Sequence, residues 1–319
     1  MSYVEDQDVI LSEKASFWEP KCFIRTVKRL ENANKLTSDF SQLVAERASI
    51  ENSYSENLRK WSSKWSSLVS TGIEYGTGAQ PWNAVCEEAN QISDMHKKNA
   101  DVLTQEIQAQ IKRWQKEQFH KSHVPGQTLK EAKMLEHEFE TAQKPWSKKL
   151  KKLSQCKKDY YLACKHLSSL KVQAENAYND PSGTQEQLKK IQEKTKRAET
   201  DQSRTQAAYQ GAVSELKSDE SRYQDDMRRV FDKSQGLEQC RLAFFKQMFI
   251  GIYEALDLSK KHNIESIYTS MVKTIGTSSP EEDLTIWSNN HGINMPFVCP
   301  QFEVRKTVFV HDLSGLFAL

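Results

Sequence analysis

The chain has 319 residues, of which 37% are hydrophobic and 28% are charged, and its formal net charge at pH 7 is +2. Only 11 glycines and 8 prolines interrupt it. This composition argues against a compact globule with many turns and favours long helices with narrow apolar stripes. Such helices bury little surface alone, so we expect the chain to associate through its stripes. The near-neutral net charge excludes little, and the distribution of charge along the chain is more informative.

Long runs with few glycines or prolines predict the helical elements. They cover about residues 23–70, 82–121, 128–178 and 184–262, with joints at 72–82, 123–127 and 179–183. Pro145 lies inside the third run, where a kink is tolerable. A helix of about 50 residues is about 75 Å long. These runs predict an all-α fold, an elongated bundle of long antiparallel helices, followed by short breaker-rich segments after residue 262.

Six cysteines are scattered along the chain, and no pair has C-x-x-C spacing. They predict small buried hydrophobic side chains in a reducing compartment. The first residues, MSYVEDQDVI, lack a basic start and an apolar core, and no apolar run is long enough to span a bilayer. We therefore expect a cytoplasmic protein.

The stretch KPWSKKLKKLSQCKK, residues 144–158, contains seven lysines and no acid. On a helix with about 100° per residue, its side chains separate into two groups. A lysine stripe on one side contains Lys144, Lys148, Lys151, Lys152, Lys158 and Lys165, and a packing side contains Trp146, Leu150, Leu153, Cys156, Tyr160, Cys164 and Leu167. Lys149 and Lys157 fall on the packing side, where we expect their stems to lie along its margins.

Two readings of the lysine stripe remain open. A solvated helix face is one, but such faces usually mix signs through pairs of glutamate and lysine one turn apart. Residues 144–173 contain nine lysines and a single acid, Asp159, which favours an anionic partner. Two further basic groups extend this pattern, although a solvated rod tip explains the second as well. They are Arg25, Lys28 and Arg29 in the first run, and Lys189, Lys190, Lys194, Lys196 and Arg197 at the start of the fourth.

The type of basic residue separates the candidate partners. Base-edge recognition favours arginine, and stacking on single strands needs aromatic side chains among the cations. Here lysine dominates and the aromatic residues lie on the packing side, so we do not expect nucleic-acid binding. A lysine-rich surface suits anionic lipid. The alternative is a helical cytoskeletal or adaptor scaffold with no direct membrane role.

No pattern in the sequence predicts catalysis, a cofactor or a metal site. His120 and His123 form an H-x-x-H pair, but no flanking carboxylate completes a metalloenzyme motif. Glycine-rich phosphate loops and nucleophile elbows are not found in the sequence. We interpret the two histidines as polar residues at a helix end.

Blocks along most of the chain resemble the F-BAR domain of the syndapin/pacsin family (protein kinase C and casein kinase substrate in neurons). These blocks occur in the family's order: FWEP (17–20), RTVKR (25–29), ERASIENSYSENLRKW (46–61), YGT (75–77), FHK (119–121), AQKPWSKKLKK (142–152), EQLKKIQ (186–192), NHGINM (290–295) and PQFE (300–303). The resemblance divides the chain into an acidic N-terminal segment (1–15), an F-BAR domain (16–303) and a divergent tail (304–319).

The resemblance implies a crescent-shaped homodimer of long helices. Its concave, lysine-rich face would bind membranes containing phosphatidylserine and phosphoinositides and would sense or generate curvature. The implied roles are endocytosis, vesicle trafficking, membrane tubulation and actin-linked membrane remodelling, at the plasma membrane and at endocytic membranes.

Three features of the sequence depart from the family's pattern. The resemblance implies a membrane-inserting wedge loop at His123, Val124 and Pro125, but only the last two are apolar, and a plain turn is the alternative. Lys21 and Cys22 stand where the family usually has glycine and asparagine. The family's SH3 domain has no counterpart here, so its partners, dynamin and actin regulators, are expected only of a longer form.

Overall fold

The computed structural model describes residues 15–121, 129–179, 184–261 and 264–304. Regular structure in these residues is helical, apart from an isolated β-bridge between Lys121 and Leu129. The helices are α2 (Ile24–Val69), α3 (Ala79–Val102), α4 (Ala109–Gln118), α5 (Lys130–Tyr178), α6 (Gln185–Leu256), α7 (Ile264–Ile275) and α8 (Pro280–His291). Short 3-10 helices η1 (Gly76–Gly78) and η3 (Leu258–Lys260) and a π-helix, η2 (Leu103–Gln108), complete the order. The predicted all-α fold is confirmed.

The long helices coincide with the predicted runs to within a few residues. Pro145 lies inside α5 without ending it, and α6 continues for 72 residues. A capping box starts α6, because the Thr184 hydroxyl accepts a hydrogen bond from the backbone N–H of Gln187 and the Gln187 side chain accepts one from the backbone N–H of Thr184. The second run differs from the prediction, since η2 separates α3 from α4. A single π-helical turn leaves no break in composition, so apolar periodicity does not reveal it.

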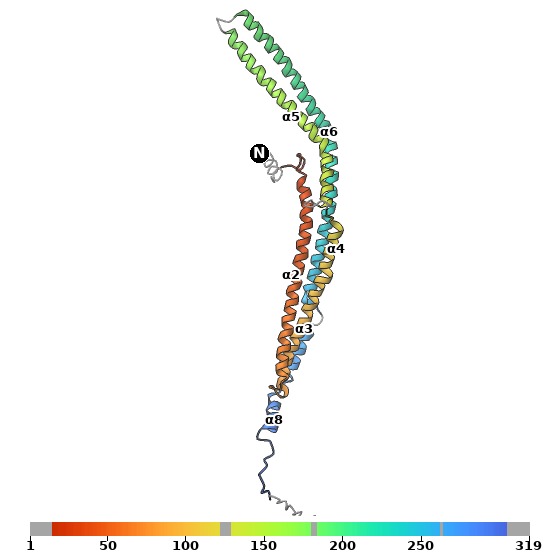
Figure 1. Ribbon diagram of the computed structural model, residues 1–319, viewed down its shortest axis with the longest axis vertical. Helices are drawn as coiled ribbons and strands as arrows, with labels where there is room; N and C mark the ends of the chain where they lie inside the picture. Colours follow the sequence, from red (N-terminus) through yellow and green to blue (C-terminus); the bar gives the residue numbers. More distant parts are fainter. Residues whose placement is uncertain (1–14, 122–128, 180–183, 262–263, 305–319) are drawn as a thin grey trace, which may run out of the picture. The chain divides into compact units, whose positions relative to one another are not determined.

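The chain divides into two compact units. The first contains residues up to Asn52 together with Lys98–Asp257, and the second contains Ser53–Lys97 together with the residues from Leu258 onward. Helices α2 and α3 each contribute to both units. In the first unit, α5 and α6 lie side by side as a long antiparallel hairpin (Figure 1).

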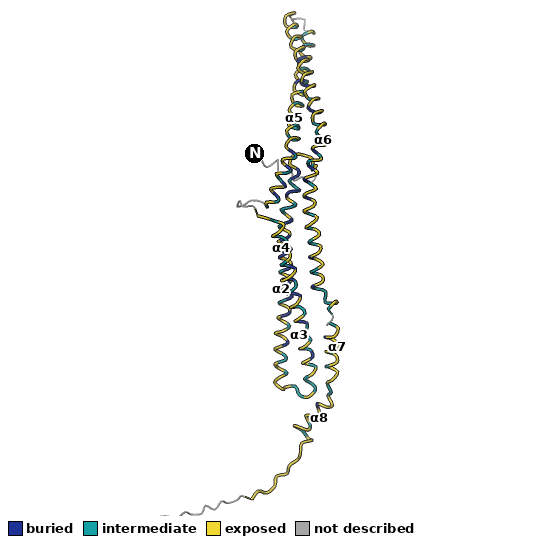
Figure 2. The backbone as a smooth tube through the Cα atoms, turned by 90° about the vertical axis from the view of Figure 1, so that its right-hand side faces the viewer, coloured by how far each residue is buried: buried dark blue, intermediate teal, exposed yellow. Residues whose placement is uncertain are grey.

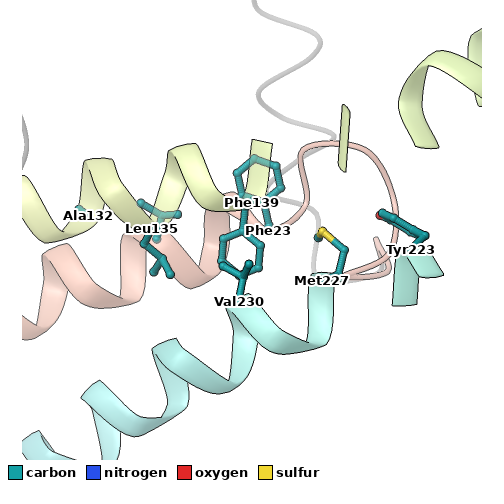
Figure 3. Packing of buried hydrophobic residues seen from close by; sticks show 8 residues of the cluster. Phe23, Ala132, Leu135, Phe139, Tyr223, Met227 and Val230 are labelled. Carbon is teal, nitrogen blue, oxygen red and sulfur yellow. The ribbon is translucent and has the colours of Figure 1, made fainter. Parts of the chain in front are cut away.

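One core cluster of the first unit lies where α2 begins, between α5 and α6 (Figure 3). The rings of Phe23 and Phe139 stack with their centroids 5.1 Å apart. Phe139 and Met227 have no exposed surface. The cluster contains Phe23, Val27, Ala132, Leu135, Phe139, Tyr223, Met227 and Val230. We call this part the hairpin base, residues 130–146 of α5 and 223–234 of α6.

A second cluster of the first unit joins α2, η2, α4 and α6. It contains Phe40, Val44, Ala48, Leu103, Ile107, Ile111, Met248 and Ala255. Leu103 and Ile107 both lie in the π-helix and are both buried. Four elements therefore share one apolar core, and each contributes one stripe to it.

Beyond the base, the hairpin continues as two helices alone. We call residues 147–178 of α5 and 185–222 of α6 the hairpin arm. Buried residues are sparse along it (Figure 2). On α5 they are Ala163 and Leu170, and on α6 they are Ala198, Thr205 and Ala212. Two helices cover only one stripe of each other, so most of the arm's surface remains exposed.

In the second unit, α8 is attached to the turn at η1 by a buried aspartate. The Asp283 carboxylate accepts hydrogen bonds from the Thr77 backbone N–H at 2.5 Å and from the Thr77 hydroxyl at 2.9 Å. Gly76 has a positive φ of 61°, and a Cβ there would lie 2.0 Å from the Asp283 Oδ1 atom. The YGT block therefore needs glycine at this position, because any side chain would displace the aspartate.

The prediction that the cysteines are buried is correct for two of them. Cys22 and Cys86 are buried, and Cys156 and Cys164 are half-buried between α5 and α6. Cys240 and Cys299 are exposed, which corrects the prediction. Cys240 lies on the outer side of α6, and Cys299 lies in the irregular segment after α8.

Candidate functional site

The hairpin arm separates the side chains of α5 as the helical wheel predicts. All seven residues of the predicted packing side are half-buried, and Tyr160 stacks against Tyr209 of α6 with ring centroids 6.1 Å apart. All six lysines of the predicted stripe are exposed. The packing surface and the basic surface of α5 are therefore distinct.

Acids from α6 neutralise one edge of this basic surface, which the sequence of α5 alone does not reveal. Lys149 lies 2.5 Å from the Asp219 carboxylate, and Lys152 lies 2.8 Å from Glu215. Further along the arm, Lys171 lies 3.7 Å from Glu199. The scarcity of acids along α5 itself therefore does not leave this edge unpaired. The acids lie more than 60 residues away in sequence from Lys149 and Lys152 and reach them through the register of the hairpin.

The pair formed by Lys152 and Glu215 affects both charges. Its hydrogen bond raises the pKa of the Lys152 ammonium group and lowers the pKa of the Glu215 carboxyl group. Both side chains are exposed, so solvent screens the attraction and the pair contributes little to stability. Its main effect is to cancel one of the six charges of the stripe.

The other five lysines of the stripe form no ion pair with any described residue. They are Lys144, Lys148, Lys151, Lys158 and Lys165. Their spacings of three, four and seven residues place them on one side of α5. Lys157, predicted at the packing margin, is exposed, and its ammonium group lies over the Tyr161 ring, 5.6 Å from the centroid. The arm thus presents a row of positive charges that the rest of the described chain leaves uncompensated.

The basic group at the start of α6 has a mixed arrangement. Its five cations are all exposed, but Lys190 pairs with Glu186 at 2.9 Å. Lys190, Lys194 and Arg197 precede Asp201 by eleven, seven and four residues, so these three share its side of α6. Asp201 lines a hollow together with Leu162 and His166 of α5. Lys189 and Lys196 lie on another side of the helix, so the group is not one surface.

The third basic group, at the start of α2, belongs to the base. The Arg25 guanidinium donates a hydrogen bond to the Ala15 carbonyl oxygen, and that of Arg29 donates to the Ser234 hydroxyl at 3.3 Å. Both arginines are half-buried, whereas Lys28 is exposed. The group lines a hollow of about 350 Å³ that also contains Arg241, which is paired with Glu238 at 2.6 Å.

Gln143 fixes the start of the lysine stripe to the residues just before α2. Its side-chain oxygen accepts a hydrogen bond from the Lys21 N–H at 2.7 Å, and its amide nitrogen donates to the Tyr223 hydroxyl at 3.0 Å. Tyr223 donates in turn to the Trp18 carbonyl at 2.8 Å and stacks on Trp146. Burial raises the pKa of the Tyr223 hydroxyl, which keeps it a donor. The FWEP and AQKPW blocks therefore form one buried polar contact.

His120 has a carboxylate partner. Its Nδ1 lies 2.7 Å from Glu131 Oε1, and its backbone N–H donates to the other oxygen of Glu131 at 3.0 Å. Burial alone would raise the pKa of Glu131, but the hydrogen bonds from His120 lower it. His123, Val124 and Pro125, the predicted wedge loop, lie outside the described residues, as do residues 1–14 and the tail from residue 305.

Sequence reasoning missed several exposed apolar residues. In the first unit, α2 exposes Leu36, Leu43 and Ile50 at intervals of seven residues. In the second unit, α2 exposes Tyr54, Trp61 and Leu68 at the same interval. The sequence reveals such spacing, but it does not distinguish a stripe covered by its own chain from one left open.

Comparisons with known proteins identify the class. A family profile described as "Fes/CIP4, and EFC/F-BAR homology domain" matches residues 23–98. The solved F-BAR domain of Drosophila Syndapin/PACSIN is 41% identical, with a TM-score of 0.83 over 90% of this chain and 99% of that one. The Hof1p F-BAR domain shares the fold alone, at 13% identity and a TM-score of 0.53. The chain therefore has an F-BAR fold.

Full-length relatives narrow the class to a family. Protein kinase C and casein kinase substrate in neurons protein 1 of Danio rerio is 35% identical over 98% of this chain and 70% of its own length. Protein 2 of Gallus gallus is 38% identical over 90% of this chain and 64% of its own. The chain belongs to the syndapin/PACSIN family, and it spans about two thirds of the length of these relatives.

F-BAR domains are membrane-remodelling modules that form elongated helical dimers and bind membranes; they are not enzymes. No helix within the described ranges is long and apolar enough to cross a membrane.

Proposed function

We propose that this chain binds anionic phospholipid membranes through the lysine stripe of α5. The observation that carries the proposal is the row Lys144, Lys148, Lys151, Lys158 and Lys165, exposed and without ion pairs among the described residues. An anionic surface attracts each nearby lysine by about 1 kcal/mol, and several lysines on one side of a rigid helix act together. Phosphatidylserine and phosphoinositides are the proposed lipids.

The two other basic groups are secondary parts of the proposed surface. Lys190, Lys194 and Arg197 lie on the side of α6 that borders the stripe, and Lys28 is the exposed cation of the α2 group. Lys189, Lys196, Arg25 and Arg29 are assigned supporting roles, because they lie on another side of α6 or are tied to protein acceptors. In a family of membrane-remodelling modules, this surface supports roles in curvature, endocytosis, vesicle trafficking and actin-linked remodelling at the cytoplasmic side of the plasma membrane.

Two matched triple variants test the stripe. The first, Lys148→Gln, Lys151→Gln and Lys158→Gln, removes three unpaired lysines. The control, Lys149→Gln, Lys152→Gln and Lys171→Gln, removes three lysines of the same helix that pair with acids of α6. Both lower the net charge equally, so a difference between them reports position.

In co-sedimentation with vesicles of phosphatidylcholine and phosphatidylserine, the first variant should bind about a hundredfold more weakly, as expected for about 3 kcal/mol. The control should bind less than about tenfold more weakly, since its lysines lie at the edge of the stripe, where acids of α6 hold their ammonium groups. Equal binding by the two variants would contradict the assignment of the stripe. Wild-type binding that ignores anionic lipid and salt would contradict the proposed function itself.

We also propose that the chain acts as a homodimer. Support comes from the apolar residues that α2 leaves exposed, Leu36, Leu43 and Ile50 in the first unit and Tyr54, Trp61 and Leu68 in the second. In analytical ultracentrifugation, the 36.8 kDa chain should sediment as a dimer, and Leu36→Gln with Leu43→Gln and Ile50→Gln should shift it toward monomer. A folded wild-type monomer at nanomolar concentration would count against this proposal.

A further inference from the structure

One apolar side chain lies within the lysine stripe. Leu162 has 66% of its surface exposed, more than any of the packing-side residues around it. It follows Lys158 by four residues and precedes Lys165 by three, so the two lysines flank it on one side of α5. The stripe is therefore not purely basic at this point.

The neighbours of Leu162 on the same arc make its identity unusual. At about 100° per residue, an arc about 100° wide centred on Lys151 contains ten positions between 144 and 176. Nine of them are polar or basic: Lys144, Ser147, Lys151, Gln155, Lys158, Lys165, Ser169, Gln173 and Asn176. The remaining position is Leu162. Single exposed leucines are common on protein surfaces, so the position of this one within the arc carries the argument.

Packing within the hairpin does not explain Leu162. The residues that hold this part of the arm together are Ala163, which is buried, and Tyr160 and Leu167, which are half-buried. Leu162 instead borders a hollow of about 410 Å³ that also contains Asp159 and Asp201. With two thirds of its surface exposed, Leu162 can be replaced by a polar side chain at little cost to the fold.

Two acids lie near the lysines at this part of the arm. Asp159, which accepts a hydrogen bond from Gln155 at 2.8 Å, adds a negative charge beside Lys158. Asp201 is paired with Arg204 at 2.6 Å, so it adds little net charge. Asp159 thus offsets part of the attraction of Lys158 for an anionic surface, and an apolar contact would add to what remains.

We propose that Leu162 inserts into the boundary between headgroups and acyl chains when the lysine stripe rests on an anionic bilayer. This inference rests on the proposed function. Lysine stems are flexible, and their ammonium groups can extend sideways to the phosphates while the helix settles at the boundary. Lys158 and Lys165, within about 6 Å along the helix axis, would hold Leu162 against the surface.

The proposal predicts that binding has an electrostatic component, which salt weakens, and an apolar component, which salt does not weaken. Attraction between lysines and lipid is screened as the Debye length falls from about 10 Å at 0.1 M salt to about 3 Å at 1 M. Burial of an apolar side chain is not screened. Leu162 should therefore account for much of the binding that persists at high salt.

The role of Leu162 can be tested with substitutions that leave α5 helical. Glutamine has a helix propensity close to that of leucine, so Leu162→Gln changes polarity and little else in an exposed position. Leu284→Gln on α8 is the matched control, because Leu284 is 67% exposed. Leu162→Trp is the gain-of-function variant, since tryptophan favours the membrane interface. The unfolding midpoint of each variant should equal that of the wild type.

The measurement is co-sedimentation with phosphatidylcholine–phosphatidylserine vesicles at about 0.1 M and about 1 M salt. At high salt, Leu162→Gln should bind about three- to tenfold more weakly than the wild type, and Leu162→Trp more strongly. Leu284→Gln should match the wild type. If Leu162→Gln matches the wild type while the triple variant of unpaired lysines loses binding, the stripe stands and the insertion of Leu162 is wrong. If that triple variant also binds normally, the proposed function fails with it.

Discussion

The base and the arm of the α5–α6 hairpin contain the same two helices, yet different interactions hold them together. At the base, α2 and the residues just before it (16–23) cover both helices. Phe139 and Met227 lose all exposed surface, and Gln143 connects three parts of the chain. Along the arm, most contacts are half-buried, and exposed ion pairs such as that of Lys152 and Glu215 border them.

Because of this difference, substitutions in the base and substitutions on the exposed face of the arm should affect stability to different extents. A buried core tolerates few changes, because each lost methylene group leaves a cavity. An exposed face tolerates many, because its side chains contribute little to the folded state. The lysine stripe begins at Lys144, next to Gln143, so the rigid base positions an exposed surface whose side chains can be changed with little effect on folding.

Truncation of a buried side chain at the base should cause the largest loss of stability and so tests the contrast between base and arm. Phe139→Ala should destabilise the protein by about 3–5 kcal/mol, since it removes a fully buried ring that stacks on Phe23. Leu167→Ala, on the half-buried packing side of the arm, should cost clearly less. Urea unfolding followed by circular dichroism measures both. Equal losses for the two variants would mean that the arm is as well packed as the base.

Much of this contrast could be predicted from the sequence, because it depends on local spacing. The scarcity of glycine and proline gave the long helices, and the wheel of residues 144–167 separated Trp146 and Leu153 from Lys148 and Lys151. Each of these inferences needs only the geometry of one helix. The family resemblance supplied the class of protein from blocks such as AQKPWSKKLKK, and the comparisons confirm it.

The features that could not be predicted depend on contacts between segments that are distant in the sequence. The neutralisation of Lys149 and Lys152 requires the register that brings Asp219 and Glu215 beside them. The role of Gln143 requires the residues just before α2 to lie against α5, as its contact with Lys21 shows. The exposure of Leu162 could not be predicted for a related reason. The sequence does not show whether α6 covers this leucine or leaves it open, and the structure shows it 66% exposed.

The smallest expected change in stability concerns the backbone conformation of Lys21, next to the base. Lys21 has a φ of 68°, the left-handed region, where a side chain other than glycine costs about 1–2 kcal/mol. The hydrogen bond from its N–H to Gln143 and the burial of Cys22 and Phe23 hold it there. The resemblance places glycine at this position in most of the family, and glycine adopts this conformation without steric cost.

Lys21→Gly should therefore stabilise the protein, by about 0.5–1 kcal/mol once the greater flexibility of glycine in the unfolded chain is subtracted. Lys21→Ala is the control, because alanine keeps the Cβ that causes the strain. A urea midpoint that rises for glycine and not for alanine confirms that this strain exists at the base. If both variants shift equally, the lysine side chain is the cause. The hydrogen bond between Lys21 and Gln143 would then be maintained without backbone strain at Lys21.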